Sequence, residues 1–139
     1  MESKIGKVIT LNKREFKAKI FDYSYTKDWN YKGEIPAVID FYADWCMPCK
    51  MVAPLLSKLS EEYDGKVKFY KINTEKDPEV AKLFGISSIP TLLFIPPTGQ
   101  PTMVRGAQPI GALRKNVEKI LPASGEQKSI FGRLFSFNK

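Results

Sequence analysis

The sequence feature that most constrains this chain is an apolar segment at residues 37–42, followed closely by two cysteines, Cys46 and Cys49. The segment is rich in β-forming side chains and largely apolar at both alternating positions, as expected for a strand that is covered on both faces. Beyond the cysteines, apolar residues recur at the spacing of one helix face. These residues are Val52, Leu55, Leu56, Leu59 and Tyr63. The sequence therefore predicts that the cysteines lie where a central strand gives way to a helix.

Such a position gives the two thiols different chemistry. If Cys46 is the N-cap, Pro48 falls in the first turn, where its missing N–H costs little, and Cys49 lies one turn further on. The two sulfurs can then meet. The first-turn amides and the helix dipole favour a thiolate at Cys46, whereas Cys49 is placed to resolve a mixed disulfide. Pro54, deeper in the same helix, is predicted to bend its axis.

The chain resembles the thioredoxin family through the motif Trp-Cys-Met-Pro-Cys-Lys at residues 45–50, Asp40 before it and Ile-Pro-Thr at residues 89–91. The resemblance covers about residues 5–121 and is to a bacterial-type thioredoxin. It implies an α/β protein with the thioredoxin fold, a central mixed β-sheet flanked by helices on both faces. There are two departures from the family pattern. Met47 stands where the commonest motif has glycine, which bears on the redox potential, and Tyr42 stands where many thioredoxins carry tryptophan.

The resemblance also implies an activity, a protein-disulfide reductase that works by dithiol-disulfide exchange in electron transport and cell redox homeostasis. Cys46 would attack the disulfide of a protein substrate, and Cys49 would release the product. The expected redox group is the Cys46–Cys49 disulfide, with no other cofactor, and a thioredoxin-reductase-like donor would recharge it. Two alternatives stay open at this point. One is a disulfide oxidase or isomerase on the same fold, and the other is a non-enzymatic binding module, against which the intact dithiol argues.

Two charged residues are candidates for proton transfer. Asp40 stands in an otherwise apolar strand, where a carboxylate is costly, so its pKa should be raised and it would suit a proton acceptor for Cys49. Lys71 shares strand parity with Val67 and Phe69 and is predicted to point into the same interior. By resemblance Lys71 would lie near Asp40. The alternatives are a structural carboxylate and an ordinary surface lysine.

The resemblance further implies a substrate-binding surface around the thiols. Pro90 would be the cis-proline opposite them, leaving the backbone of Ile89 exposed to pair with an extended substrate. The alternative is a trans proline that merely starts the next strand. Gly106 and Ala107 match small residues at the rim, where a larger side chain would obstruct substrate; the alternative is a plain turn. The other predicted contacts are Met47, Pro48 and Trp45, and a structural role beside the motif explains Trp45 equally well.

Length and composition limit the remaining possibilities. The 139 residues suit one domain, predicted at residues 1–121, with a C-terminal tail at residues 122–139. That tail is either mobile or surface-packed, or it is a helix for a partner or membrane surface. No apolar run approaches the roughly 18 residues of a membrane span. The start of the chain has no apolar signal region, which predicts a cytoplasmic protein, or a periplasmic one if a signal peptide was removed.

The distribution of charge and the lack of further metal ligands argue against a nucleic-acid site and a zinc site. The net charge of +7 is spread along the chain without a dense basic block, which favours a solvated surface over nucleic-acid binding. A C-x-x-C pair can also serve a zinc site, but the chain has no histidine and no cysteine outside the motif. One chain therefore cannot complete a four-ligand site from nitrogen and sulfur, and no metal is expected. The protein is expected to act as a monomer.

The remaining periodicities predict the element order β-α-β-α-β-α-β-β-α. A capping arrangement of Asn12 and Glu15 should start the first helix, and Asp77 should be the N-cap of a short helix that ends at Gly85. Aromatic side chains in the segment 22–36 are expected to pack against the domain. The other predicted strands lie at residues 7–10, 66–72, 91–95 and 102–105, and the last helix at residues 110–120.

Overall fold

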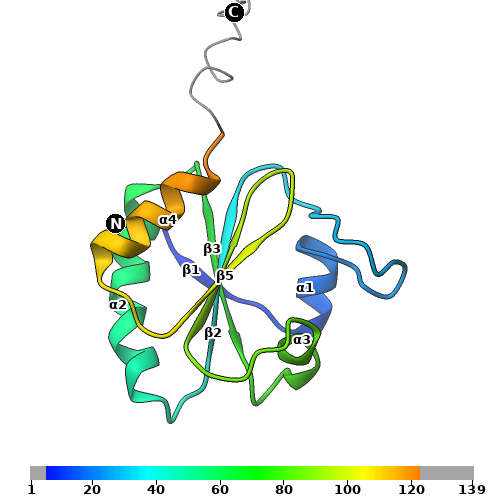
Figure 1. Ribbon diagram of the computed structural model, residues 1–139, viewed down its shortest axis with the longest axis horizontal. Helices are drawn as coiled ribbons and strands as arrows, with labels where there is room; N and C mark the ends of the chain where they lie inside the picture. The colour runs from blue at the N-terminus through cyan, green and yellow to red at the C-terminus, as the bar shows by residue number, and fades with distance from the viewer. Residues whose placement is uncertain (1–5, 123–139) are drawn as a thin grey trace, which may run out of the picture.

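A mixed five-stranded sheet lies at the centre of the molecule in the computed structural model, which describes residues 6–122 (Figure 1). The strands are β1 (Val8–Thr10), β2 (Ala37–Tyr42), β3 (Lys68–Asn73), β4 (Thr91–Ile95) and β5 (Thr102–Arg105). The helices are α1 (Lys13–Lys19), α2 (Met47–Glu62), α3 (Pro78–Leu83) and α4 (Ile110–Ile120). Their order along the chain is the predicted one.

The strand pairing makes β2 the central strand. The spatial order is β1-β3-β2-β4-β5; β1, β3 and β2 run parallel, and β4 and β5 pair antiparallel to their neighbours. Parallel strands end at the same edge of a sheet. The ends of β2 and β3 therefore lie together, and the segments that lead into α2 and α3 start from this edge, at the bottom of Figure 1.

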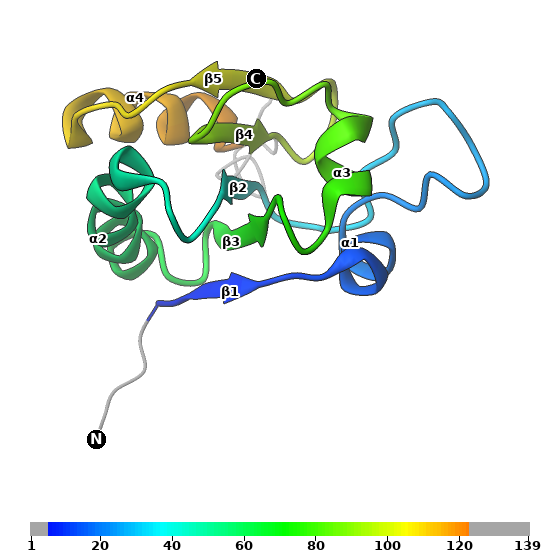
Figure 2. The same ribbon diagram turned by 90° about the horizontal axis from the view of Figure 1, so that it is seen from below.

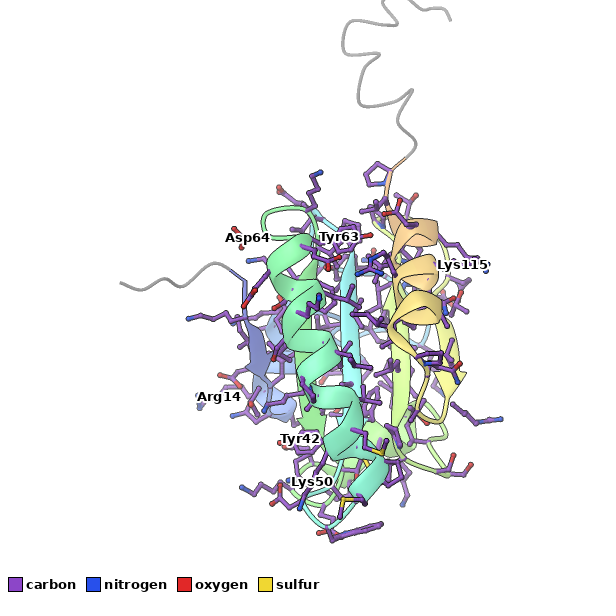
Figure 3. All side chains as sticks on the ribbon, turned by 90° about the vertical axis from the view of Figure 1, so that its left-hand side faces the viewer. Arg14, Tyr42, Lys50, Tyr63, Asp64 and Lys115 are labelled. Carbon is purple, nitrogen blue, oxygen red and sulfur yellow. A yellow bond between two sulfur atoms is a disulfide. The ribbon has the colours of Figure 1, made fainter. Side chains whose placement is uncertain are left out.

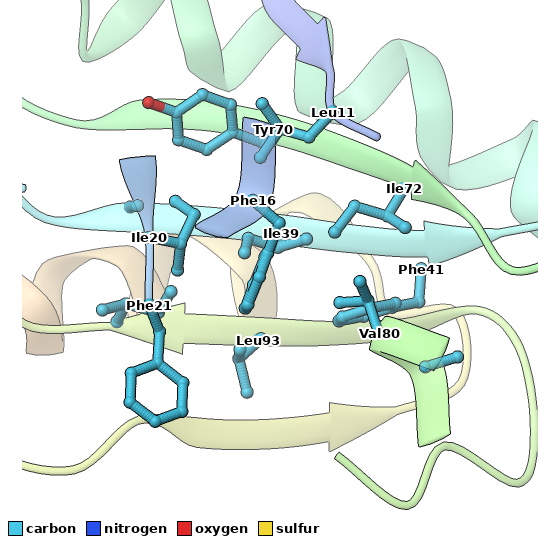
Figure 4. Packing of buried hydrophobic residues seen from close by; sticks show 13 residues of the cluster. Leu11, Phe16, Ile20, Phe21, Ile39, Phe41, Tyr70, Ile72, Val80 and Leu93 are labelled. Atoms are coloured by element: carbon cyan, nitrogen blue, oxygen red, sulfur yellow. The ribbon is translucent and has the colours of Figure 1, made fainter. Parts of the chain in front are cut away.

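The alternation of β2 side chains explains why its sequence is apolar at both positions. Ile39 and Phe41 join the hydrophobic cluster on the side of α1 and α3, whose packing Figure 4 shows. Val38 points the other way, into the cluster formed with α2 and α4. Helices therefore cover each face of the sheet, as both Figure 1 and Figure 2 show. Asp40 shares the α2 side of the sheet with Val38.

The long segment before β2 covers the α1 and α3 side of the core. Its Trp29 ring lies 5.0 Å from that of Phe21 and 6.1 Å from that of Phe84, measured between centroids. Tyr23 and Tyr31 also pack against this cluster. Tyr25 is 87% exposed, so the prediction of packed aromatics is wrong for this residue. It lies in a turn of the protruding loop, beyond the reach of the cluster.

Local hydrogen bonds define the helix starts and the β3 boundary. Asn12 and Glu15 form the predicted reciprocal capping box of α1. Asp77 is the N-cap residue of α3, but its carboxylate accepts from the backbone N–H of Lys13 instead of capping α3. Strand β3 begins at residue 68 and not at 66, because the backbone N–H groups of residues 66 and 67 donate to the Tyr63 carbonyl and keep them in a turn.

The predicted tail lies outside the described residues beyond Pro122, so the domain boundary at residue 121 stays a prediction. Within residues 6–122, no helix is both long enough and apolar enough to cross a membrane. Whether Pro54, which lies inside α2, bends the helix also stays a prediction.

The capping box gives a test of the fold. Replacing Asn12 by alanine removes the acceptor for the Glu15 N–H, so Asn12→Ala should lower the free energy of unfolding by about 1 kcal/mol. Urea denaturation measures this loss. Asn30→Ala is the control, because Asn30 is exposed and lies in an irregular segment. Equal losses in the two variants would contradict the capping role.

Candidate active site

The two cysteines form a disulfide at the start of α2. Cys46 is the N-cap in an extended backbone conformation, Pro48 lies in the first turn, and the Cα atoms of Cys46 and Cys49 are 5.3 Å apart. The backbone N–H of Cys49 donates to Cys46 Sγ over 3.2 Å. Figure 3 shows sulfur atoms at this end of α2, close to the labelled Tyr42 and Lys50. When the disulfide is reduced, this amide and the helix dipole favour a thiolate at Cys46.

The two cysteines line different spaces. Both cysteines are only 3% exposed. Cys46 lines a groove of about 520 Å³, whereas Cys49 lines a separate cavity of about 150 Å³ together with Asp40 and Lys71. A partner that reaches Cys46 through the groove therefore does not occupy the space beside Cys49.

The groove contains four of the residues that the sequence predicted to contact substrate, Trp45, Met47, Pro48 and Ile89. Trp45 and Met47 are each 66% exposed, so the wall beside the disulfide is apolar and open to solvent. The remaining lining residues were not predicted: Thr74, Ala81, Ile86, Ser87 and Ser88. Ser87 and Ser88 could have been predicted from the sequence, because they stand directly before the Ile-Pro-Thr motif.

Trp45 is held in place by a residue that sequence reasoning missed. Its indole N–H donates to the carboxylate of Glu75. Glu75 lies in the turn after β3, and its own backbone N–H donates to the Asn73 side chain. This contact joins two sides of the groove that are 30 residues apart in the chain. No local pattern in the sequence connects them.

The opposite wall of the groove is the loop that ends at Pro90. The Ile89–Pro90 peptide bond is cis, as the resemblance implied. The Ile89 carbonyl oxygen lies 3.8 Å from Cys46 Sγ. Gly106 donates its backbone N–H to the Pro90 carbonyl over 2.8 Å. Gly106 and Ala107 are therefore next to this loop, although neither lines the groove itself.

Glycine at position 106 is explained by its backbone conformation. Its φ is +87°, which side-chain-bearing residues rarely adopt. A Cβ built there would meet nothing within 4 Å, so crowding inside the domain does not require glycine. A side chain at this position would project into open space beside the groove.

Asp40 has the buried environment that the sequence predicted. It is 3% exposed, and its Oδ1 has no hydrogen-bond partner among the described residues. Burial raises the pKa of the Asp40 carboxyl to about 7, and the positive charge of Lys71 opposes part of this rise. Asp40 and Cys49 line the same cavity, so the carboxyl is placed to exchange a proton with this thiol.

Lys71 lies at the cavity, on the side of the sheet that its strand parity predicts. Its backbone is in register with Asp40 across the parallel β2–β3 pair, and it is one of the residues that line the cavity. Its Nζ lies 5.6 Å from the centroid of the Tyr42 ring. The ion pairs formed within residues 6–122 do not include one between Lys71 and Asp40. The carboxyl therefore keeps its raised pKa beside a nearby cation.

Metal ligands are not gathered anywhere in the described part of the chain. Among residues 6–122, no group of three or more histidine, cysteine, aspartate or glutamate side chains could hold a metal ion. The sulfurs are joined to each other in the disulfide.

A family model named thioredoxin matches residues 7–119, which covers most of the chain. The chain belongs to the thioredoxin family. It is 45% identical over 98 residues to a thioredoxin of Borreliella burgdorferi, a match that covers 70% of this chain and 84% of the relative. It is 42% identical over 103 residues to a thioredoxin of Synechocystis sp., covering 74% and 95%.

A solved structure supports the same family assignment. A crystal structure of chloroplastic thioredoxin z aligns with a TM-score of 0.69 and 25% identity over 85% of this chain and 97% of that one. This thioredoxin is therefore a thiol-disulfide oxidoreductase, an enzyme that reduces protein disulfides through the redox-active disulfide at the start of α2.

The burial of Asp40 predicts a pH-dependent gain in stability for Asp40→Asn. The carboxyl has a pKa of about 7 in the folded state and its ordinary 3.8 in the unfolded chain, so the folded state binds the proton more tightly. The stability that comes from this tighter proton binding is present in full below pH 3.8, and it is lost as the pH rises through 7. The substitution should change the free energy of unfolding little near pH 4. Near pH 8 it should raise it by up to about 4 kcal/mol.

Chemical denaturation of the disulfide form at several pH values measures this gain without titration of the thiols. Asp44→Asn is the matched control, because Asp44 lines the same cavity but is exposed to solvent. A gain of equal size at pH 4 and pH 8 would show that Asp40 does not carry a raised pKa.

Proposed function

We propose that this thioredoxin reduces protein disulfides with Cys46 as nucleophile, Cys49 as resolving thiol and Asp40 as the proton acceptor for Cys49. One observation carries the proposal: Cys49 lines the same cavity as Asp40, whose carboxyl Oδ1 has no hydrogen-bond partner within residues 6–122. The N-cap position of Cys46 supports its role, because the Cys49 amide is already directed at its sulfur.

The first step takes place in the groove. The Cys46 thiolate attacks one sulfur of the substrate disulfide, and the other substrate sulfur leaves as a thiolate that takes a proton from water. The product is a mixed disulfide between Cys46 and the substrate. The exposed apolar wall of Trp45 and Met47 and the backbone of Ile89 would hold an extended chain beside the sulfur.

The second step takes place on the side of the cavity. The Cys49 thiol gives its proton to Asp40, directly or through water, and its thiolate attacks Cys46 Sγ. The mixed disulfide breaks, the second substrate thiolate leaves and takes up a proton, and the Cys46–Cys49 disulfide forms. The substrate has gained two electrons and two protons. A cavity of about 150 Å³ has room for water, whose share of liquid volume is about 30 Å³.

The remaining proposals concern partners and location. The disulfide must be reduced again after each turnover, so we propose a thioredoxin-reductase-like donor and a reducing compartment, the cytoplasm, with the periplasm as the alternative. The groove suits protein substrates and not nucleic acid, since its wall beside the disulfide is apolar. We propose that the protein acts as a monomer without a further cofactor. Lys71 would moderate the pKa of Asp40.

The assignment of the two thiols predicts different behaviour for the two serine variants. Cys46→Ser should abolish reduction of a model disulfide, because the nucleophile is lost. Cys49→Ser keeps the nucleophile but cannot resolve the intermediate, so it should accumulate mixed disulfides with substrate proteins. Non-reducing electrophoresis and mass spectrometry detect these adducts. Equal trapping by both variants would overturn the assignment.

The reduction potential separates a reductase from an oxidase or isomerase. A reductase of this family should equilibrate near the thioredoxin value of about −270 mV, whereas isomerase-like proteins lie near about −180 mV. Equilibration of the wild-type protein with glutathione or dithiothreitol redox buffers, read by thiol alkylation, measures the potential. A value near −180 mV or above would replace the reductase proposal with the oxidase or isomerase alternative. Met47→Gly tests how far the residue between the cysteines affects this value.

A further inference from the structure

Among the described residues, Tyr42 is the one aromatic residue that lines the Asp40 cavity, and the proposed reaction steps give it no role. It is the last residue of β2 and is partly buried. The ammonium of Lys71 lies 5.6 Å from the centroid of its ring, within the range of a cation–π contact. Figure 3 shows Tyr42 at the end of α2 that carries the disulfide.

Charged and titratable groups face Asp40 from three directions. Lys71 comes from β3, Asp44 from the segment after β2, and Lys50 and the Cys49 thiol from α2. Lys50 and Asp44 are exposed, so water screens their charges. Lys71 is partly buried and is the one whose charge acts appreciably on the pKa of Asp40. The position of the Lys71 ammonium is therefore the variable that matters for this carboxyl.

The Lys71 ammonium could take either of two positions near the cavity. It could pair directly with the Asp40 carboxylate, or it could rest against the Tyr42 ring. The structure has the second arrangement: the ammonium lies over the ring, and Asp40 Oδ1 has no hydrogen-bond partner among residues 6–122. A direct pair would stabilise the charged carboxylate and make it a weaker base.

We propose that Tyr42 is a positioning residue whose ring holds the Lys71 ammonium at the edge of the cavity and so keeps it from pairing with Asp40. This inference rests on the proposed role of Asp40 as proton acceptor. The ring, and not the phenol hydroxyl, carries the effect, because the contact is made with the aromatic face. Tryptophan at this position should act in the same way.

The test is the pH dependence of the resolving step, followed by stopped-flow methods, together with the ¹³C chemical shift of the Asp40 carboxyl. Tyr42→Leu keeps the site apolar but removes the ring. It should move the midpoint of both titrations downward by about half a pH unit. Tyr42→Phe and Tyr42→Trp keep a ring and should retain the wild-type midpoint. A merely structural role for Tyr42 would change stability in these variants without this pattern.

A double-substitution cycle shows whether Tyr42 acts through Lys71. Lys71→Met alone should raise the midpoint, because the opposing charge is removed. In the Lys71→Met background, Tyr42→Leu should no longer move the midpoint. Equal shifts from Tyr42→Leu in both backgrounds would overturn the proposal. An independent check on the wild-type protein is the Lys71 ε-methylene resonance, which should be shifted upfield by the ring; an unshifted resonance would also overturn it.

The Asp40→Asn variant separates a failure of the proposed role of Asp40 from a failure of the proposed role of Tyr42. If the pH dependence of the resolving step persists in Asp40→Asn, Asp40 is not the acceptor and the proposed function fails in that part. If the dependence disappears in Asp40→Asn but Tyr42→Leu leaves the wild-type midpoint in place, the role of Asp40 stands and only the role of Tyr42 is overturned.

Discussion

A buried carboxyl in an apolar strand is the constraint on which the rest of this site depends. Asp40 occupies a position of β2 where the neighbouring side chains are apolar, and its Oδ1 finds no hydrogen-bond partner in the part of the chain that the structure describes. Such a group destabilises the folded chain whenever it is ionised. The same burial gives it a pKa of about 7, where a base can both accept and release a proton near neutral pH. Ionisation of Asp40 therefore lowers the stability of the folded state, whereas the proposed proton transfer needs the ionised form.

The sheet topology determines what surrounds this carboxyl. Because β2 and β3 are parallel and in register, Lys71 lies beside Asp40 on the same side of the sheet. The start of α2 follows β2 after a short turn, so Cys49 lies over the same end of the strand. The groove depends on a more distant contact, since its opposite wall, at Ile89, belongs to the segment before β4. A cation, an acid and a thiol are thus brought together by one crossover connection.

Much of this arrangement could be predicted from the sequence, and most of the failures concern contacts between residues far apart in the chain. The strand-to-helix junction and the helix start at Cys46 follow from local periodicity, so they were predicted with the burial of Asp40. Two hydrogen bonds that were not predicted join residues far apart in the chain. One links Trp45 to Glu75, and the other links the Lys13 backbone N–H to Asp77. Tyr25 differs because the sequence shows aromatic residues but not which of them the loop carries away from the core.

The separation of the two spaces around the disulfide fits the two steps of the proposed mechanism. In that mechanism a substrate joined to Cys46 occupies the groove, so a base could not approach the thiols from that side. The proposed acceptor, Asp40, lines the separate small cavity together with Cys49. Burial of the carboxyl itself keeps the pKa of Asp40 high, and the cavity beside it has room for water to carry a proton. The placement of the dithiol at the first turn of α2 gives each cysteine a different space to line.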